Sequence, residues 1–263
     1  MASILKKIYK YKLEEIHARK NNISFKDLVS NLKNSNLIER GFLESLKKSA
    51  KEKVTPVIAE IKKASPSQGI IRENFDVAEI AKSYEEGGAT CLSVLTDFPS
   101  FQGKDEYIVV AKNNCNLPIL RKDFFIDPYQ VVESKLLGAD CILIILAMLD
   151  KEQARELYDT SIMYDMDAIF EVHNEEEYDI AEKLNARIIG INNRNLHNFE
   201  TSIETTTKLS HKFNKDIFVL SESGIKDRSD IEKLNSFGVN GYLIGQSFMA
   251  EKNIKKAIKE LIK

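Results

Sequence analysis

The chain has 263 residues, of which 43% are hydrophobic and 30% are charged, and its formal net charge is −2. This composition is that of an ordinary globular protein, and the length allows one large domain or two small ones. A nearly balanced charge gives the chain no general attraction to polyanions, so we expect neither nucleic acid nor a membrane surface as a partner.

Cysteine usage and the N-terminal sequence bear on the cellular compartment. Cys91 and Cys141 lie in apolar runs, as small core residues do, and together with Cys115 they form no C-x-x-C motif. The N-terminus lacks the apolar core of a signal peptide, and no apolar run approaches the ~20 residues that cross a bilayer. We therefore expect a cytoplasmic protein with reduced thiols.

The first 52 residues are rich in lysine and have helical periodicity. This periodicity predicts helices over residues 4–20, 24–33 and 42–51, and Ser24, with Asp27 three positions later, predicts the N-cap of the second helix. Lysine runs of this kind are typical of solvated helix faces. We expect residues 1–52 to form a helical extension within the same domain as residues 53–263.

From residue 55 onward, short apolar runs alternate with amphipathic stretches of helical length. The apolar runs predict eight strands, at residues 56–61, 90–95, 118–120, 140–146, 167–172, 187–191, 216–220 and 240–244. The other stretches predict helices at residues 74–87, 104–114, 127–138, 150–164, 174–185, 200–212, 227–237 and from 250 to the end. Eight alternating units indicate a parallel sheet and fit a (β/α)8 TIM barrel, with a doubly wound open sheet as the alternative.

Charged and polar residues stand where the predicted strands end. After the first strand, Glu60 and Lys62 are two positions apart and so face the same side, before a turn cluster that begins at Ser65. Alone, this pair indicates a surface ion pair. Further strands end in the same way, at Asp97; Arg121, Lys122 and Asp123; Glu171; Asn192 and Arg194; Glu222; and Gln246. Since the carboxyl ends of barrel strands form one face, this repetition favours a catalytic site over a structural explanation.

Small residues follow the last two predicted strands. Ser223-Gly224 and Gly245-Gln246 would let backbone N–H groups approach an anion, and the loops after strands seven and eight commonly bind phosphate in this fold. Ser65 reaches the neighbouring position because the barrel closes. Ordinary left-handed turn glycines are the alternative. The pattern favours a phosphorylated substrate.

Several other kinds of site lack support in the sequence. The four histidines show no i, i+4 pairing, and no cluster has zinc-ligand spacing, so we expect no metal site. The chain has no G-x-S-x-G elbow, no Walker loop and no glycine-rich nucleotide motif after a strand. Lysine and glutamate are therefore the main candidates for proton transfer.

A series of motifs in chain order carries a resemblance to a known family. The motifs are I-A-E-I-K-K-A-S-P-S-Q-G-I-I-R, L-T-D at 95–97, F-Q-G at 101–103, P-I-L-R-K-D-F-F-I-D-P-Y-Q at 118–130, L-L-G-A-D-C-I-L-I-I, E-V-H-N-E-E-E, G-I-N-N-R-N-L at 190–196, S-E-S-G-I at 221–225 and L-I-G-Q-S-F-M at 243–249. From about residue 5 to residue 250, the chain resembles the monofunctional indole-3-glycerol-phosphate synthases of tryptophan biosynthesis.

The resemblance implies a reaction and its requirements. The substrate, 1-(2-carboxyphenylamino)-1-deoxyribulose 5-phosphate, would close to indole-3-glycerol phosphate with loss of CO2 and water. The enzyme would be a carboxy-lyase that needs neither cofactor nor metal. In the family the N-terminal extension lies over the active-site end of the barrel. The chain leaves no room for a second barrel, so we expect one activity, in a monomer or weak homodimer.

The resemblance also implies roles for individual residues. Lys122 would be the general acid, Glu171 would act in the later proton transfer and dehydration, and Lys62 would hold the substrate carboxylate. The other residues would orient or bind, namely Glu60 at the lysines; Asn192 and Glu222 at the substrate and intermediate; Arg194 on the carboxylate side; Phe101, Phe124 and Leu143 at the aryl ring; and Ser65, Ser223, Gly224, Gly245 and Gln246 at the phosphate.

Departures from the family pattern and rival functions stay open at this point. Gln246 stands where Ser or Glu is expected, and Pro99-Ser100 makes the loop before Phe101 unusual. The nearest rivals are other phosphate-binding barrels, such as phosphoribosylanthranilate isomerase or ribulose-phosphate epimerase, although an epimerase would need metal-binding His and Asp at the strand ends. A barrel that only senses or scaffolds would not need both Lys122 and Glu171.

Overall fold

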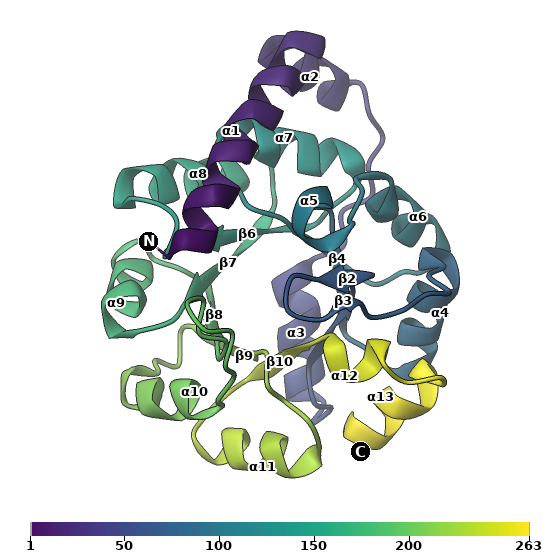
Figure 1. Ribbon diagram of the computed structural model, residues 1–263, viewed down its shortest axis with the longest axis vertical. Helices are drawn as coiled ribbons and strands as arrows, with labels where there is room; N and C mark the ends of the chain where they lie inside the picture. The colour runs from purple at the N-terminus through teal and green to yellow at the C-terminus, as the bar shows by residue number, and fades with distance from the viewer. Residues whose placement is uncertain (1, 263) are drawn as a thin grey trace.

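The computed structural model describes residues 2–262 as a closed barrel of eight parallel strands ringed by helices (Figure 1). In chain order the barrel strands are β1 (Val57–Ile61), β4 (Cys91–Leu95), β5 (Ile119–Lys122), β6 (Cys141–Ile145), β7 (Asp167–Val172), β8 (Ile188–Asn192), β9 (Phe218–Glu222) and β10 (Gly241–Ile244). Each strand pairs with the next, and β1 pairs with β10 to close the ring. The prediction of a (β/α)8 barrel is confirmed, and the open-sheet alternative is wrong.

Helices link successive strands and cover the outside of the barrel. They are α4 (Val77–Gly87), α6 (Glu106–Asn114), α7 (Pro128–Leu137), α8 (Lys151–Met163), α9 (Glu175–Lys183), α10 (Glu204–Leu209) with the 3-10 turn η1 (Ser210–Lys212), α11 (Arg228–Ser236) and α13 (Ile254–Ile262). Asp127 and Asp150 start α7 and α8 with complete capping boxes, which satisfy free N–H groups of the first turn. Every residue of β1, β4 and β6 is buried, by the helices on the outside of the barrel or by side chains on the inside, which explains why their sequences are mostly apolar.

The predicted strands agree with the observed ones to within two residues at each end. Four short elements were not predicted, namely β2 (Ala64–Ser65), β3 (Gly69–Ile70), α5 (Phe98–Phe101) and α12 (Gln246–Met249). All four lie in loops that follow barrel strands. The helix predicted at 200–212 begins only at Glu204, because a bridge between Arg194 and Thr201 holds the preceding segment as a loop.

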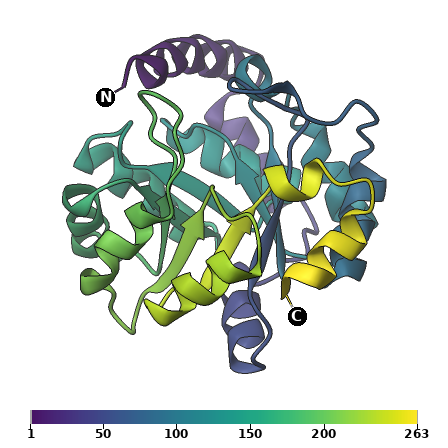
Figure 2. The same ribbon diagram turned by 60° about the horizontal axis from the view of Figure 1, so that its bottom comes forward.

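The N-terminal extension contacts both ends of the barrel (Figure 2). Its helices are α1 (Ser3–Asn22), α2 (Phe25–Lys33) and α3 (Phe42–Lys51). The long helix α1 crosses one end, and α3 lies at the other. There, the backbone N–H of Leu43 donates to Asp167 Oδ2 at 2.9 Å, and Phe42 and Leu46 are fully buried in the barrel core.

One expectation for this extension is confirmed and another is wrong. The Ser24 side chain accepts the Asp27 N–H and caps α2, as predicted. The lysines were expected to be solvated, but Lys12 is only 1% exposed. Its Nζ lies 2.7 Å from Asp123 Oδ1 and 2.9 Å from Asp97 Oδ1. Two buried carboxylates of the barrel therefore compensate the charge of Lys12, although the sequence pattern of α1 predicts a solvated lysine at this position.

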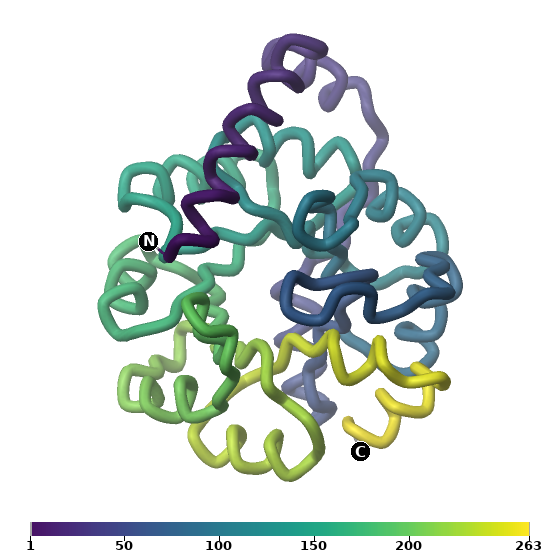
Figure 3. Tube along the Cα trace, in the orientation of Figure 1, coloured from purple at the N-terminus to yellow at the C-terminus, as the bar shows by residue number. Residues whose placement is uncertain are grey.

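The C-terminal helix α13 completes the outer ring beside α4 (Figure 3). Gly87 makes this contact possible, because a Cβ at that position would lie 3.1 Å from the Ile258 side chain. Within residues 2–262, no helix is both long enough and apolar enough to cross a membrane.

Candidate active site

A cavity of about 300 Å³ opens at the carboxyl ends of the strands, and every barrel strand contributes to its wall. Helix α1 covers it with Ile4, Leu5 and Ile8, which sequence analysis did not identify. All of the residues predicted for the site line this cavity, namely Glu60, Lys62, Ser65, Phe101, Lys122, Phe124, Leu143, Glu171, Asn192, Arg194, Glu222, Ser223, Gly224, Gly245 and Gln246. The fold thus brings these residues together, while their chemical roles stay predictions.

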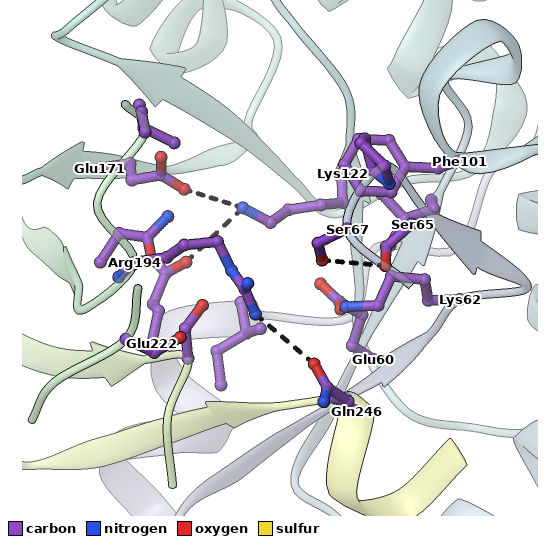
Figure 4. A pocket seen from close by; sticks show the side chains of 18 of the residues that line it. Glu60, Lys62, Ser65, Ser67, Phe101, Lys122, Glu171, Arg194, Glu222 and Gln246 are labelled. Atoms are coloured by element: carbon purple, nitrogen blue, oxygen red, sulfur yellow. Dashed lines mark hydrogen bonds and ion pairs between the residues drawn. The ribbon is translucent and has the colours of Figure 1, made fainter. Parts of the chain in front are cut away.

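Lys122 lies between two carboxylates of the cavity wall, Glu171 and Glu222 (Figure 4). Its Nζ is 2.9 Å from Glu171 Oε2 and 3.5 Å from Glu222 Oε2. Burial lowers the pKa of Lys122, but Glu171, Glu222 and Glu60 outweigh burial and raise that pKa overall. Burial likewise raises the pKa of Glu171, but Lys122 and then His173 lower it below its ordinary value. The pair is therefore an ammonium and a carboxylate at neutral pH.

Among the carboxyls of the cavity, Glu222 has a raised pKa. Burial, with repulsion from Glu171 and Glu60, raises its pKa to about 7 against the opposing effect of Lys122. Its Oε1 is buried and has no hydrogen-bond partner. Gly190 provides the space for this oxygen, since a Cβ there would overlap it. Glu222 can therefore exchange a proton near neutral pH.

Replacing Glu222 by glutamine is expected to stabilise the protein above pH 7 relative to wild type. With the pKa of Glu222 at about 7 in the folded state and 4.5 ordinarily, the folded protein holds a proton in this window that the unfolded chain releases. Raising the pH through this window therefore lowers the free energy of unfolding of the wild type, by an amount on the order of 1–3 kcal/mol at pH 8. Glu222→Gln has no proton to release at this position, so its stability should not fall in this way. Urea unfolding of both proteins at pH 5 and pH 8 measures the difference, and an identical pH dependence would contradict it.

A second ion pair forms where β1 ends. Lys62 Nζ contacts Glu60 Oε1, and Glu60 is only 5% exposed, so the alternative of a surface ion pair is wrong. Gly245 makes room for this carboxylate, because a Cβ there would lie 2.5 Å from Glu60 Oε1. This need for space explains Gly245 better than a left-handed turn does, since its φ is −129°.

Aromatic side chains form one wall of the cavity. Phe101 and Phe124 have ring centroids 6.2 Å apart, and Leu143 lies in the same lining. The unusual Pro99-Ser100 sequence builds the short helix α5, in which the Asp97 side chain accepts the Ser100 N–H at 3.0 Å. Phe101 is the last residue of that helix, so this loop delivers the ring to the cavity.

Loops after β9 and β10 form a polar part of the cavity. Ser223 and Gly224 adopt positive φ values of 65° and 79°. Gly224 is therefore also the left-handed turn glycine that the sequence analysis gave as the alternative. Gln246 starts α12, and its Oε1 lies 3.5 Å from Arg194 Nη2, which reaches across from the loop after β8 (Figure 4). Ser65 also lines this cavity, with Ser67 beside it at 3.4 Å between hydroxyls. Hydroxyls, a guanidinium and two loops of small residues thus line space suited to an anion.

Some polar residues at the strand ends serve the fold instead. Arg121 does not line the cavity and is 1% exposed, with Nη2 2.7 Å from Asp105 Oδ1 and Nη1 2.8 Å from Glu133 Oε2. Asp97 pairs with Lys12 as described above, and so does Asp123, which also reaches the cavity wall. Part of the repeated polar pattern therefore anchors α1 and the outer helices.

Sequence analysis also gave no role to His173, which lies behind Glu171 and outside the cavity lining. Its position two residues after Glu171, directly after β7, was the available indication. Within residues 2–262, no group of three or more His, Cys, Asp or Glu side chains is arranged to hold a metal ion.

Solved structures with low sequence identity share the barrel. One is a thiamine phosphate pyrophosphorylase from Pyrococcus furiosus, 18% identical with a TM-score of 0.57, over 80% of this chain and 94% of that one. Another is an N-acetylmannosamine-6-phosphate 2-epimerase from Clostridium perfringens, 16% identical with a TM-score of 0.60, over 81% of this chain and 93% of that one. At these identities the likeness concerns the fold alone.

Sequence relatives are far more similar. The family model of indole-3-glycerol phosphate synthase matches residues 5–261. An indole-3-glycerol phosphate synthase of Legionella pneumophila (strain Paris) is 47% identical over 262 residues, covering 100% of this chain and 99% of that protein. One from Zymomonas mobilis subsp. pomaceae is 43% identical with the same coverage. The chain therefore belongs to the indole-3-glycerol phosphate synthase family, the carboxy-lyases that form the indole ring in tryptophan biosynthesis.

Proposed function

We propose that this cavity converts 1-(2-carboxyphenylamino)-1-deoxyribulose 5-phosphate into indole-3-glycerol phosphate, CO2 and water. The observation that carries the proposal is the setting of Lys122. Its half-buried ammonium, 2.9 Å from a carboxylate, shares one cavity with an aromatic wall and two loops suited to an anion. A substrate with an aryl acid at one end and a phosphate at the other matches that arrangement.

The first step joins the ring carbon that bears the carboxylate to the sugar carbonyl. Negative charge builds on the carbonyl oxygen, and Lys122 is placed to donate a proton to it. Lys62 holds the carboxylate until CO2 leaves and the benzene ring regains its aromaticity. Glu60, in contact with Lys62 Nζ, orients that lysine.

The second step is a dehydration, which removes a hydroxide and a proton. A lysine ammonium supplies the proton that turns hydroxide into water, and Glu171 accepts the proton released as the indole forms. Asn192 and Glu222 position the intermediate. The pKa of about 7 lets Glu222 donate or accept a hydrogen bond as the oxygen changes charge.

Binding of the two ends of the substrate shapes the flexible chain for ring closure. Phe101, Phe124 and Leu143 contact the aryl ring. Arg194 was expected on the carboxylate side of that ring, but its contact with Gln246 favours a place beside the phosphate. The phosphate is held by Ser65, Ser223, Gly224, Gly245 and Gln246. Fixing both ends places the reacting carbons close together and removes most of the entropy cost of closing the ring.

Indole fluorescence tests the proposal directly. Adding the carboxyphenylamino-deoxyribulose phosphate to the purified protein without metal should produce the fluorescence of the indole product. A folded protein that binds inorganic phosphate but shows no turnover would refute the proposal and favour a sensor or another barrel enzyme.

We also propose a single domain, a cytoplasmic location and a monomer or weak homodimer. Shared burial of Phe42, Leu43 and Leu46 in the barrel core supports one domain. The free, buried thiols of Cys91, Cys115 and Cys141 fit a reducing compartment. One unfolding transition in calorimetry and a monomer mass in sedimentation at micromolar concentration are the expected results.

A further inference from the structure

His173 occupies the first position after β7, with its ring fixed by α9. Its Nδ1 lies 3.1 Å from Glu177 Oε2, and its backbone N–H donates to the same oxygen at 2.7 Å. Glu177 Oε1 in turn accepts from Asn174 Nδ2 at 2.8 Å. A carboxylate with these donors only accepts hydrogen bonds, so Nδ1 of His173 carries a hydrogen.

The other ring nitrogen faces Glu171. Nε2 of His173 is 3.6 Å from Glu171 Oε1, is buried and has no hydrogen-bond partner. Lys122 Nζ holds the second oxygen of the same carboxylate, at 2.9 Å. The Glu171 carboxylate therefore lies between an ammonium and an imidazole, one at each oxygen.

The surroundings favour the protonated imidazole. With Nδ1 already protonated, a neutral ring would turn the lone pair of Nε2 towards a carboxylate oxygen, which is repulsive and leaves a buried acceptor unsatisfied. Burial lowers the pKa of His173, but the hydrogen bond to Glu177 and the charges of Glu171, Glu177 and Glu222 raise it overall. An imidazolium would instead present an N–H to Glu171, and a displacement of ~0.5 Å would bring it to hydrogen-bond distance.

We propose that His173 is a positioning residue for Glu171. The imidazolium of His173 keeps the Glu171 carboxylate charged and in place when Lys122 turns to the substrate. This inference rests on the proposed function. Lys122 cannot protonate the substrate oxygen and neutralise Glu171 at the same moment. Without a second cation, the buried Glu171 would take up a proton and cease to be a base. Glu177 holds the His173 ring in this orientation and keeps Nδ1 protonated.

Two substitutions at His173 separate positioning from packing. His173→Asn retains a donor near Nδ1 and removes the group that faces Glu171, so kcat should fall roughly 10- to 100-fold with KM changed by less than about 3-fold. His173→Gln places a neutral amide nitrogen near the position of Nε2, which restores a donor but not the charge, so its kcat should fall between those of wild type and His173→Asn. His211→Asn is the matched control, since His211 is exposed in η1 and pairs with Glu175, the first residue of α9, at 3.5 Å. It should leave kcat unchanged.

NMR of the wild-type protein tests the inference without turnover. Spectra of ¹⁵N-labelled histidine, assigned by the loss of a signal in His173→Asn, should show both ring nitrogens protonated at pH 7. A neutral ring with a bare Nε2 would overturn the inference even if the enzyme is active. Equal losses of kcat in the Asn and Gln variants, or no loss in either, would overturn it as well. An inert wild type would refute the proposed function, while the NMR result would still decide the state of His173.

Discussion

Replacing Lys122 with methionine is expected to lower kcat by at least ~100-fold, the lower range for a group that transfers a proton. Methionine keeps much of the side-chain volume and removes the ammonium. It also leaves Glu171 and Glu222 without the cation that lies 2.9 Å and 3.5 Å from their oxygens. Without this cation the pKa of Glu222 should rise further, while His173 still faces Glu171, so the loss reports mainly the missing acid. Initial rates of indole formation at saturating substrate measure the loss.

Lys104→Met is the matched control, because Lys104 is exposed and lies outside the catalytic cavity. It should change neither kcat nor KM. A Lys122→Met protein with wild-type activity would leave the reaction assignment intact and move the acid role to another lysine. Lys62, in contact with Glu60, would be the residue to replace next.

The barrel could be predicted because its evidence is local and repeated. Most strands begin with an apolar run, and several helices have a side-chain cap, as at Asp127 and Asp150. Closed topology then places the strand ends on one face, so polar residues at those ends could be assigned to one site before any distance was known. The elements that were missed, such as α5 and β2, are too short to have a periodicity.

What could not be predicted depends on contacts between distant segments. A lysine in an amphipathic helix resembles its solvated neighbours, and only the positions of Asp97 and Asp123 show that Lys12 is buried. Gly190 and Gly245 resemble ordinary strand and turn glycines in the sequence. The reason for each is a carboxylate oxygen that occupies the space of the missing Cβ, Glu222 at one and Glu60 at the other.

Replacing Lys12 with methionine is expected to lower the free energy of unfolding by about 3–5 kcal/mol, the cost of leaving buried charges without their partner. Lys12 Nζ contacts Asp123 Oδ1 at 2.7 Å and Asp97 Oδ1 at 2.9 Å, and all three side chains are at most 1% exposed. Both aspartates follow strands that lead into the cavity, and Asp123 directly follows Lys122. Because α1 also contributes Ile4, Leu5 and Ile8 to the cavity wall, KM should rise more than kcat falls. Urea unfolding and steady-state kinetics measure the two effects.

Lys20→Met provides the comparison within the same helix. Lys20 Nζ lies 2.6 Å from Asp127 Oδ2, but its side chain is 41% exposed, so its loss should cost less than about 1 kcal/mol. A triple variant that combines Lys12→Met with Asp97→Asn and Asp123→Asn should recover part of the stability, since it removes the uncompensated charges as well. If Lys12→Met and Lys20→Met cost the same, burial of the Lys12 ion pairs does not stabilise the docking of α1. A large loss confined to Lys12→Met would mean that the charge network beneath α1 holds this helix over the active site.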